Sequence, residues 1–462
     1  MKENNPHILG TAPIGKLLLQ YSIPAIVGMT LTSLYNIIDS IFIGHGVGAM
    51  AISGLAITFP LMNLVVAFCT LVGVGGATIS SIRLGQKDQK GAEYILGNVA
   101  ILCIINAIIF GGLSLLFLKP LLIFFGATEN TLPYAYDFMQ VILLGTPISY
   151  IMIGLNNIMR ATGYPKKAMM SSLLTVGCNL VFAPIFIFVF EWGIRGAALA
   201  TLVSQFFGMI WVLYHFNNRK SFVHFKRSCF KLKRHIILSV FGIGMSPFVM
   251  NVCACCIVIF INNRLLSYGG DMAIGAFGIL NRIQMLFVMI VMGITMGMQP
   301  ISGYNYGAHR YDRVMHNLKL GIIAACSITT VGFLASELFP NIFVGMFTTN
   351  AELTSEASTA LRIGVLSFPV IGAQIVITQF FQSIGKARIS IFLSLSRQLL
   401  FLLPCLAFLP PLWGVNGVWA SMCISDMIAF ITAVLMLIYH FRHLRQLNNS
   451  MTFNTETTAA MK

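Results

Sequence analysis

The chain has 462 residues, of which 57% are hydrophobic and only 9% are Asp, Glu, Lys or Arg. Soluble globular domains carry about 25% charged residues, so this composition excludes a water-soluble protein. The net charge of +15 arises from 29 basic against 14 acidic residues, that is, from a scarcity of acids, and it does not indicate a nucleic-acid-binding protein. The composition indicates an integral membrane protein.

Taken in chain order, the apolar runs predict an all-α polytopic membrane protein with twelve transmembrane helices. A span needs about 20 mainly apolar residues. Runs of this kind, separated by polar or Gly/Pro breaks, cover residues 17–43, 50–80, 92–116, 136–159, 167–190, 195–216, 235–265, 273–300, 317–337, 356–384, 389–409 and 414–440.

The basic residues predict the orientation of these spans. With the N-terminus in the cytoplasm, 23 of the 29 Lys and Arg residues fall in cytoplasmic segments and only three fall outside, at Lys119, Arg195 and Arg264. Cytoplasmic loops are enriched in Lys and Arg, so we expect both termini to be cytoplasmic in a multi-pass protein of the inner membrane. The basic segment 219–234 is then interpreted as a cytoplasmic linker rather than a nucleic-acid or lipid-headgroup patch.

The chain also repeats itself at long range. Met50-Ala51-Ile52 recurs 222 residues later as Met272-Ala273-Ile274, and Pro147 recurs as Pro369. Six spans per half return the chain to the side where it began, so the two six-helix bundles are parallel repeats. The sequence therefore predicts lobes at 1–218 and 235–443, joined by 219–234 and followed by a polar cytoplasmic tail at 444–462. Two equal halves favour a transporter over a receptor or scaffold.

No residue constellation indicates an enzyme, and no metal site is predicted. The cysteines Cys253, Cys255 and Cys256 form a cluster, but no His, Asp or Glu stands near them in the chain, so they are interpreted as small hydrophobic residues. The sequence has no phosphate-binding Gly-rich loop, so transport is expected to draw on an ion gradient. No cofactor is expected beyond the coupling cation.

Ionisable residues inside spans are costly and are therefore functional candidates. Asp39 is the strongest, because Thr32, Tyr35, Asn36 and Asp39 share one face of the first span. A carboxylate partly shielded from water takes up a proton more readily, so Asp39 is suited to proton coupling or to contact with a cationic substrate. A purely structural carboxylate is the alternative.

The second half offers a less coherent set of candidates. Asp426 and Arg397 lie in neighbouring spans and could pair, in a functional or a structural role. Arg282, Gln299 and Gln374 add polar groups to the same half and complete a tentative substrate site.

Prolines and methionines add two further hypotheses. Pro24 and Pro247 occupy matching positions in the two halves and are hinge candidates, because each proline frees a backbone carbonyl. A stripe of Met285, Met289, Met292 and Met296 suits promiscuous binding, although a packed or lipid-facing stripe is the more common case.

Several strings resemble those of the multidrug and toxic compound extrusion (MATE) transporters. They are Tyr35-Asn-Ile-Ile-Asp39-Ser-Ile-Phe-Ile-Gly44, Gln299-Pro-Ile-Ser-Gly-Tyr-Asn-Tyr-Gly307-Ala308, Arg160-Ala-Thr-Gly163-Tyr-Pro165 and Phe381-Gln-Ser-Ile-Gly385-Lys386-Ala387. The resemblance covers essentially the whole chain. It implies two six-helix lobes that form a V, and export of organic cations in exchange for protons or sodium.

The resemblance also assigns residues to an ion-coupling site in the first lobe. Asp39 matches the carboxylate of the family's first span, and Asn179 and Thr201 match residues of the same pocket. The family's Asn-x-x-x-Asp-Pro string reads here with Ala183 in place of its aspartate. The loss of that carboxylate would weaken a sodium site more than a proton site. Asp39 alone, hydrogen-bonded by Asn179 or Tyr35, is enough to bind a proton.

The function expected from the sequence is export of amphipathic, often cationic, drugs by a proton-coupled antiporter, with sodium as the other possible coupling ion. Its expected partners are small organic substrates and membrane lipid, and a monomer is expected. A flippase for lipid-linked saccharides is the alternative, left open by Arg282 and Arg397.

Overall fold

The computed structural model describes residues 7–347 and 351–460, except for the side chains of residues 36, 37, 49, 271 and 441–460. Its regular elements in this part of the chain are all helical. Ten helices are long and apolar enough to cross a membrane, and two bent helix pairs raise the number of spans to twelve. The predicted all-helical membrane fold with up to twelve spans is confirmed.

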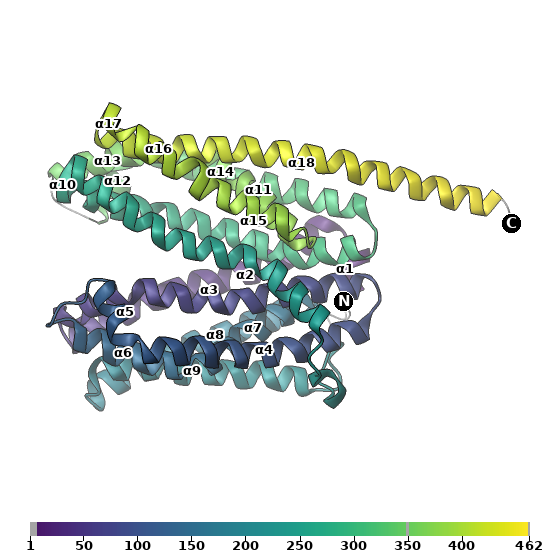
Figure 1. The fold of residues 1–462 in the computed structure, drawn as a ribbon, viewed down its shortest axis with the longest axis horizontal. Coiled ribbons are helices and arrows are strands. Elements are labelled where there is room, and N and C mark those ends of the chain that lie inside the picture. Colours follow the sequence, from purple (N-terminus) through teal and green to yellow (C-terminus); the bar gives the residue numbers. More distant parts are fainter. Residues whose placement is uncertain (1–6, 348–350, 461–462) are drawn as a thin grey trace.

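The helices form two lobes that lie side by side, seen as two layers in Figure 1. The first lobe contains the helices that precede residue 218, introduced by the short α1 (Ile8–Thr11). They are α2 (Ile14–Gly46), α3 (Ala49–Gly85), α4 (Gln89–Leu116), α5 (Leu118–Phe124), α6 (Leu132–Leu144), α7 (Thr146–Ala161), α8 (Pro165–Pro184) with its π-helical continuation η1 (Ile185–Val189), and α9 (Gly193–Asn217).

The second lobe follows a short 3-10 turn, η2 (Arg227–Phe230). Its helices are α10 (Arg234–Gly307), α11 (Tyr311–Leu338), α12 (Pro340–Gly345), α13 (Ala351–Val365), α14 (Phe368–Ser383), α15 (Ala387–Leu395), the π-helix η3 (Ser396–Leu402), α16 (Leu403–Phe408), α17 (Pro410–Trp413) and α18 (Val415–Ala460). Within α10 the backbone leaves helical geometry at Gly270, so this element consists of two antiparallel spans.

Two predicted spans are not straight helices. The expected run 136–159 is divided into α6 and α7, which meet at 57°, and the run 356–384 into α13 and α14, which meet at 53°. Pro147 and Pro369 stand in the first turns of α7 and α14. A proline lacks the N–H that would continue the preceding helix but fits the start of a new one, which explains both bends.

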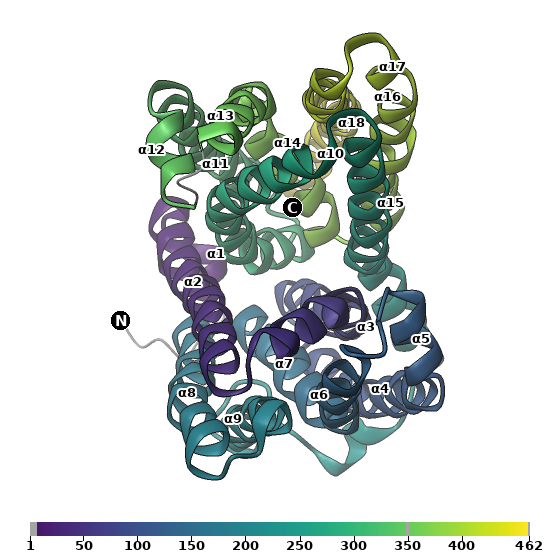
Figure 2. The ribbon, with the colours of Figure 1, turned by 90° about the vertical axis from the view of Figure 1, so that its left-hand side faces the viewer.

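The two lobes contact each other most closely at one end, which we call the basal end: α2 and α10 begin there, and α3 and α10 end there. Glycines allow this approach, because a Cβ on Gly85 would overlap the carbonyl oxygen of Tyr304 and one on Gly307 that of Ile82. We call the opposite end, with Gly48 and Gly270, the far end. Figure 2 shows α2 reaching from the first lobe across to the second.

The segment between the lobes, residues 218–233, is held against the first lobe. Asn98 of α4 donates from Nδ2 to the carbonyl oxygen of Lys231 at 3.0 Å and accepts from the backbone N–H of Lys233 at 2.9 Å. Glu93, only 2% exposed, pairs with Lys226 at 2.7 Å. These contacts fix the segment to α4, and we refer to it as the strap.

Candidate functional site

The candidate residues of the first lobe lie on three helices. Asp39 is on α2, Asn179 on α8 and Thr201 on α9, and their side chains are 8%, 2% and 7% exposed. Polar groups buried at this level must find partners within the protein. At 1.5 Å per residue, Asp39 lies roughly 10 Å from the end of α2 at Gly46, in the far half of the lobe.

Hydrogen bonds link α8 to α9, and a tyrosine from α2 joins them. Asn179 donates from Nδ2 to Oγ1 of Thr201 at 3.3 Å, and Thr201 donates to the carbonyl oxygen of Ala197 at 3.2 Å. The Tyr35 side chain interacts with both Thr201 and Asp39. The structure thus brings Tyr35, Asp39, Asn179 and Thr201 together.

One detail of the predicted site is wrong. We expected Asn179 or Tyr35 to hydrogen-bond Asp39, but the amide of Asn179 is directed to Thr201, and Oδ1 of Asp39 is buried without a hydrogen-bond partner among the described residues. The side chain of Asn36, also predicted for this site, lies outside the described part of the structure.

Beyond Asn179, the face of α8 and η1 that continues from this residue is apolar. Asn179, Ala183 and Ile187 follow one another at intervals of four residues, and all three are buried. The stretch from Ile185 to Val189 is a π-helix, which directly follows Pro184. Local π-helices often occur at functional sites, since they reorient side chains without ending the helix. Among the described residues, no three His, Cys, Asp or Glu side chains gather in a way that could hold a metal ion.

In the second lobe, the structure confirms the expected pairing of Arg397 with Asp426. Nε of Arg397 lies 2.7 Å from Oδ1 of Asp426, and Ser367 donates to Oδ2 at 3.4 Å. The arginine side chain is 33% exposed and the aspartate 13%. Arg397 itself belongs to the π-helix η3, and the first lobe also contains a π-helix, η1.

The other three candidates of the second lobe do not join this pair through any described contact. Gln299 donates from Nε2 to Oγ1 of Thr78 at 2.7 Å and so belongs to the contact between the lobes. Gln374 is buried and donates to Oγ1 of Thr378, one turn along its own helix, at 3.3 Å. Arg282 is exposed.

The segment around Pro24 and part of the methionine stripe also lie at the contact between the lobes. Ser22, two residues before Pro24, donates to the carbonyl oxygen of Ile294 at 3.4 Å, and both α2 and α10 continue as helices through Pro24 and Pro247. Met289 accepts from Ser33 at 2.8 Å, and Met296 accepts from Arg160 at 3.6 Å. At these two positions the stripe meets the first lobe rather than lipid.

Sequence reasoning missed one residue that the repeat could have revealed. Asn262 stands 15 residues after Pro247, as Asp39 stands 15 residues after Pro24. Its Oδ1 is also buried without a described hydrogen-bond partner. The second lobe therefore holds a neutral amide at the position where the first lobe holds a carboxylate.

Comparison with known proteins places this architecture in a family. The family model MatE matches residues 24–185 and 247–407, one match in each lobe. Multidrug export protein MepA of Staphylococcus aureus (strain MSSA476) is 26% identical over 442 residues, covering 95% of this chain and 96% of the relative. The protein of the same name from Staphylococcus haemolyticus (strain JCSC1435) is 26% identical over 443 residues, covering 96% and 97%.

Solved structures agree with the sequence matches. The MATE multidrug transporter DinF-BH superposes with a TM-score of 0.87 at 36% identity, covering 94% of this chain and 97% of that one. A crystal structure of MATE in the bent conformation gives a TM-score of 0.91 at 24% identity, covering 97% and 99%, and shows likeness of fold. The chain is a member of the multidrug and toxic compound extrusion (MATE) family of multi-pass membrane transporters.

Proposed function

We propose that the protein is a proton-coupled antiporter that exports amphipathic, often cationic, organic compounds. The observation that carries this proposal is Asp39, a nearly buried carboxylate with one oxygen that lacks a described hydrogen-bond partner. A buried ionised carboxylate is costly unless a proton or a cation neutralises it. Proton and organic cation would thus compete for one negative charge, which is the basis of exchange.

Protons are preferred over sodium in this proposal because the site offers a single carboxylate. A hard cation is bound by several oxygen ligands, whereas a proton needs only one. Ala183 presents a methyl group where a second carboxylate would be needed, and Thr201 and Asn179 are engaged with each other. Family relatives described as multidrug export proteins support small organic substrates.

The proposed setting is the cytoplasmic membrane, with both termini and the basal end inside the cell and the protein acting as a monomer. Basic residues at the basal end support this orientation, among them Arg83, Lys233 and Arg310. In this orientation the lobes touch on the cytoplasmic side, so substrate would leave from the far half.

The test is transport by proteoliposomes with Asp39→Asn, compared with Asp137→Asn. Asp137 pairs with Arg195 at 2.7 Å elsewhere in the first lobe, so it controls for loss of a carboxylate as such. An imposed proton gradient should drive uptake of a fluorescent organic cation in the wild type and in Asp137→Asn, and not in Asp39→Asn. Unchanged proton-driven uptake by Asp39→Asn would disprove the role of Asp39. Equal uptake driven by a sodium gradient alone would disprove the choice of proton.

A further inference from the structure

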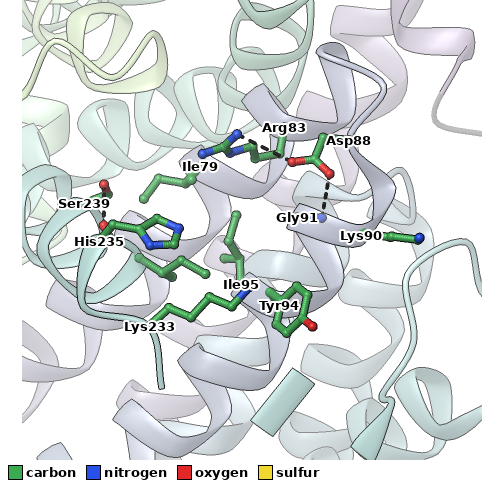
Figure 3. Close-up of a pocket in the computed structure, with 11 residues that line it drawn as sticks. Ile79, Arg83, Asp88, Lys90, Gly91, Tyr94, Ile95, Lys233, His235 and Ser239 are labelled. Carbon is green, nitrogen blue, oxygen red and sulfur yellow. Dashed lines mark hydrogen bonds and ion pairs between the residues drawn. The ribbon is translucent and has the colours of Figure 1, made fainter. Parts of the chain in front are cut away.

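A cavity of about 250 Å³ opens at the basal end between α3, α4 and the first turn of α10. Its lining combines residues from both lobes, as Figure 3 shows. Arg83 comes from the last turn of α3 and Asp88 from the start of α4, whereas Lys233 and His235 stand where the strap passes into α10. This cavity is separate from the site around Asp39.

The lining is cationic. Arg83, Lys90 and Lys233 oppose one carboxylate, Asp88, which leaves a net charge of +2 before any contribution from His235. In Figure 3 Lys90 points outward, while Arg83, Lys233 and His235 surround the hollow. The cavity therefore presents the two cationic groups of Arg83 and Lys233, with the imidazole of His235 beside them.

The single carboxylate is already engaged. Oδ1 of Asp88 accepts from the backbone N–H of Gly91 at 2.8 Å and so caps the start of α4. Its Oδ2 lies 3.5 Å from Nη1 of Arg83, a long contact through one nitrogen that leaves other guanidinium N–H groups available.

Lys233 is positioned by its surroundings. Its backbone N–H is fixed by Asn98, and its ammonium lies 3.4 Å from the centre of the Tyr94 ring. No carboxylate approaches this ammonium in the described contacts. A cation held over an aromatic ring is less strongly solvated and remains available to an anion.

The floor of the cavity is apolar, and this feature selects among anions. Ile79, Ile95 and Ile236 line it, and all three belong to predicted spans or to their first turns. A basic rim above an apolar floor at the end of a span fits an amphiphile whose phosphate meets the rim and whose glycerol and acyl groups meet the floor. Basic pockets between membrane helices bind anionic lipid headgroups in this way.

We propose that this cavity is a binding site for the phosphate of an anionic phospholipid, held between the lobes by Arg83, Lys233 and His235. Because Arg83 belongs to the first lobe and His235 to the second, the bound headgroup bridges the two lobes at the end where they already touch.

The test measures lipid binding to the full-length protein in a neutral detergent by native mass spectrometry. Dioctanoylphosphatidylglycerol, dioctanoylphosphatidylcholine and inorganic phosphate are the three probes. The double variant Arg83→Gln/Lys233→Gln removes two cavity charges, and Arg219→Gln/Lys220→Gln removes two exposed charges from the strap outside the cavity.

We expect the cavity variant to bind phosphatidylglycerol about 25-fold more weakly, since each basic residue contributes roughly a factor of five toward an anionic headgroup. The strap variant should bind it as the wild type does. Equal binding by both double variants, equal affinity for phosphatidylcholine, or full competition by inorganic phosphate at the lipid concentration would each overturn the proposal.

A second measurement needs no variant and so does not depend on how the variants fold. Amide hydrogen exchange in the wild type should slow at residues 86–91 and 233–237 when phosphatidylglycerol is added, and not when phosphatidylcholine is added. Unchanged exchange in both segments with phosphatidylglycerol would overturn the proposal.

Discussion

Lys87 and His309 adopt the same left-handed backbone conformation 222 residues apart, with φ of 61° and 56°. Each follows the basal end of a long helix, α3 in the first lobe and α10 in the second. The same spacing relates Gly48 to Gly270 and Gly163 to Gly385, all with positive φ. The repeat seen in the sequence is thus preserved in the turns.

Lys87→Gly and His309→Gly should each stabilise the protein by up to about 1 kcal/mol. A non-glycine residue in the left-handed region costs roughly 1–2 kcal/mol of stability. Glycine avoids this cost, but part of the gain is lost because glycine has more conformational freedom in the unfolded chain. Thermal unfolding in detergent would measure the change. Gln86→Gly is the control, because Gln86 has a φ of −73° and gains nothing from glycine. A lower melting temperature for Lys87→Gly than for Gln86→Gly would contradict the prediction.

Replacing only one residue of the Arg397–Asp426 pair should destabilise the protein more than replacing both residues. Asp426→Asn leaves the guanidinium of Arg397 without its charged partner at 2.7 Å, at a cost of about 1–3 kcal/mol given that Arg397 is partly exposed. Arg397→Leu/Asp426→Leu should lie closer to the wild type. A double-mutant cycle built from Arg397→Leu, Asp426→Leu and the double variant checks this through melting temperatures, and strictly additive effects would show that the pair has no coupling energy.

Gly85→Val should force the lobes apart at the basal end, because its side chain would collide with the backbone of Tyr304. Spin labels at the exposed residues Lys166 and Arg388, in a cysteine-free background, report the distance across that end. We expect a longer distance and lost drug export at normal membrane levels. Gly112→Val is the matched control, since nothing lies within 4 Å of a Cβ there. An unchanged distance in Gly85→Val would argue against tight packing of the lobes.

Ala183→Asp should create sodium binding. A carboxylate one helical turn from Asn179 would face the same buried site and add the oxygen ligands that a bare cation needs. The variant should unfold at a higher temperature in sodium chloride than in choline chloride, while the wild type should show no difference. A sodium-dependent shift in the wild type would count against proton coupling.

Lys226→Met should loosen the strap. Glu93 would keep only His224, 3.8 Å away, and the loss should amount to about 1–2 kcal/mol because Lys226 is 45% exposed. Trypsin should then cleave after Arg219 and Lys220 several times faster. Lys231→Met removes a neighbouring basic side chain for which no ion pair is described, and its cleavage rate should match that of the wild type.

Much of the fold could be predicted because a bilayer requires each span to be an apolar run of about 20 residues, and such runs are visible in the sequence. Prolines within the spans permitted kinks, but the sequence did not show that Pro147 and Pro369 would mark bends of 57° and 53°, because an apolar run that contains a proline has the same composition whether it bends or continues. Pro147 and Pro369 are 222 residues apart, so the two bends stand at matching positions of the repeat.

The sequence predicted the candidate site more completely in the first lobe than in the second. In the first lobe, helical spacing and family strings selected Tyr35, Asp39, Asn179 and Thr201, which the structure brings together. In the second lobe, polarity alone selected the residues, and polarity does not distinguish a side chain facing a site from one facing another helix. Gln299 illustrates the difference, because its amide binds Thr78 across the contact between the lobes.

The strap, which links the two lobes covalently, is also bound to the first lobe by non-covalent contacts. It is held to α4 by Asn98 and Glu93 over the stretch from Lys226 to Lys233, beyond the exposed residues Arg219 and Lys220. A cut between Arg219 and Lys220 would leave the residues that contact α4, from Lys226 to Lys233, on the C-terminal fragment, still bound to the N-terminal one. We therefore expect residues 1–219 and 220–462, translated as two separate polypeptides, to assemble into one transporter.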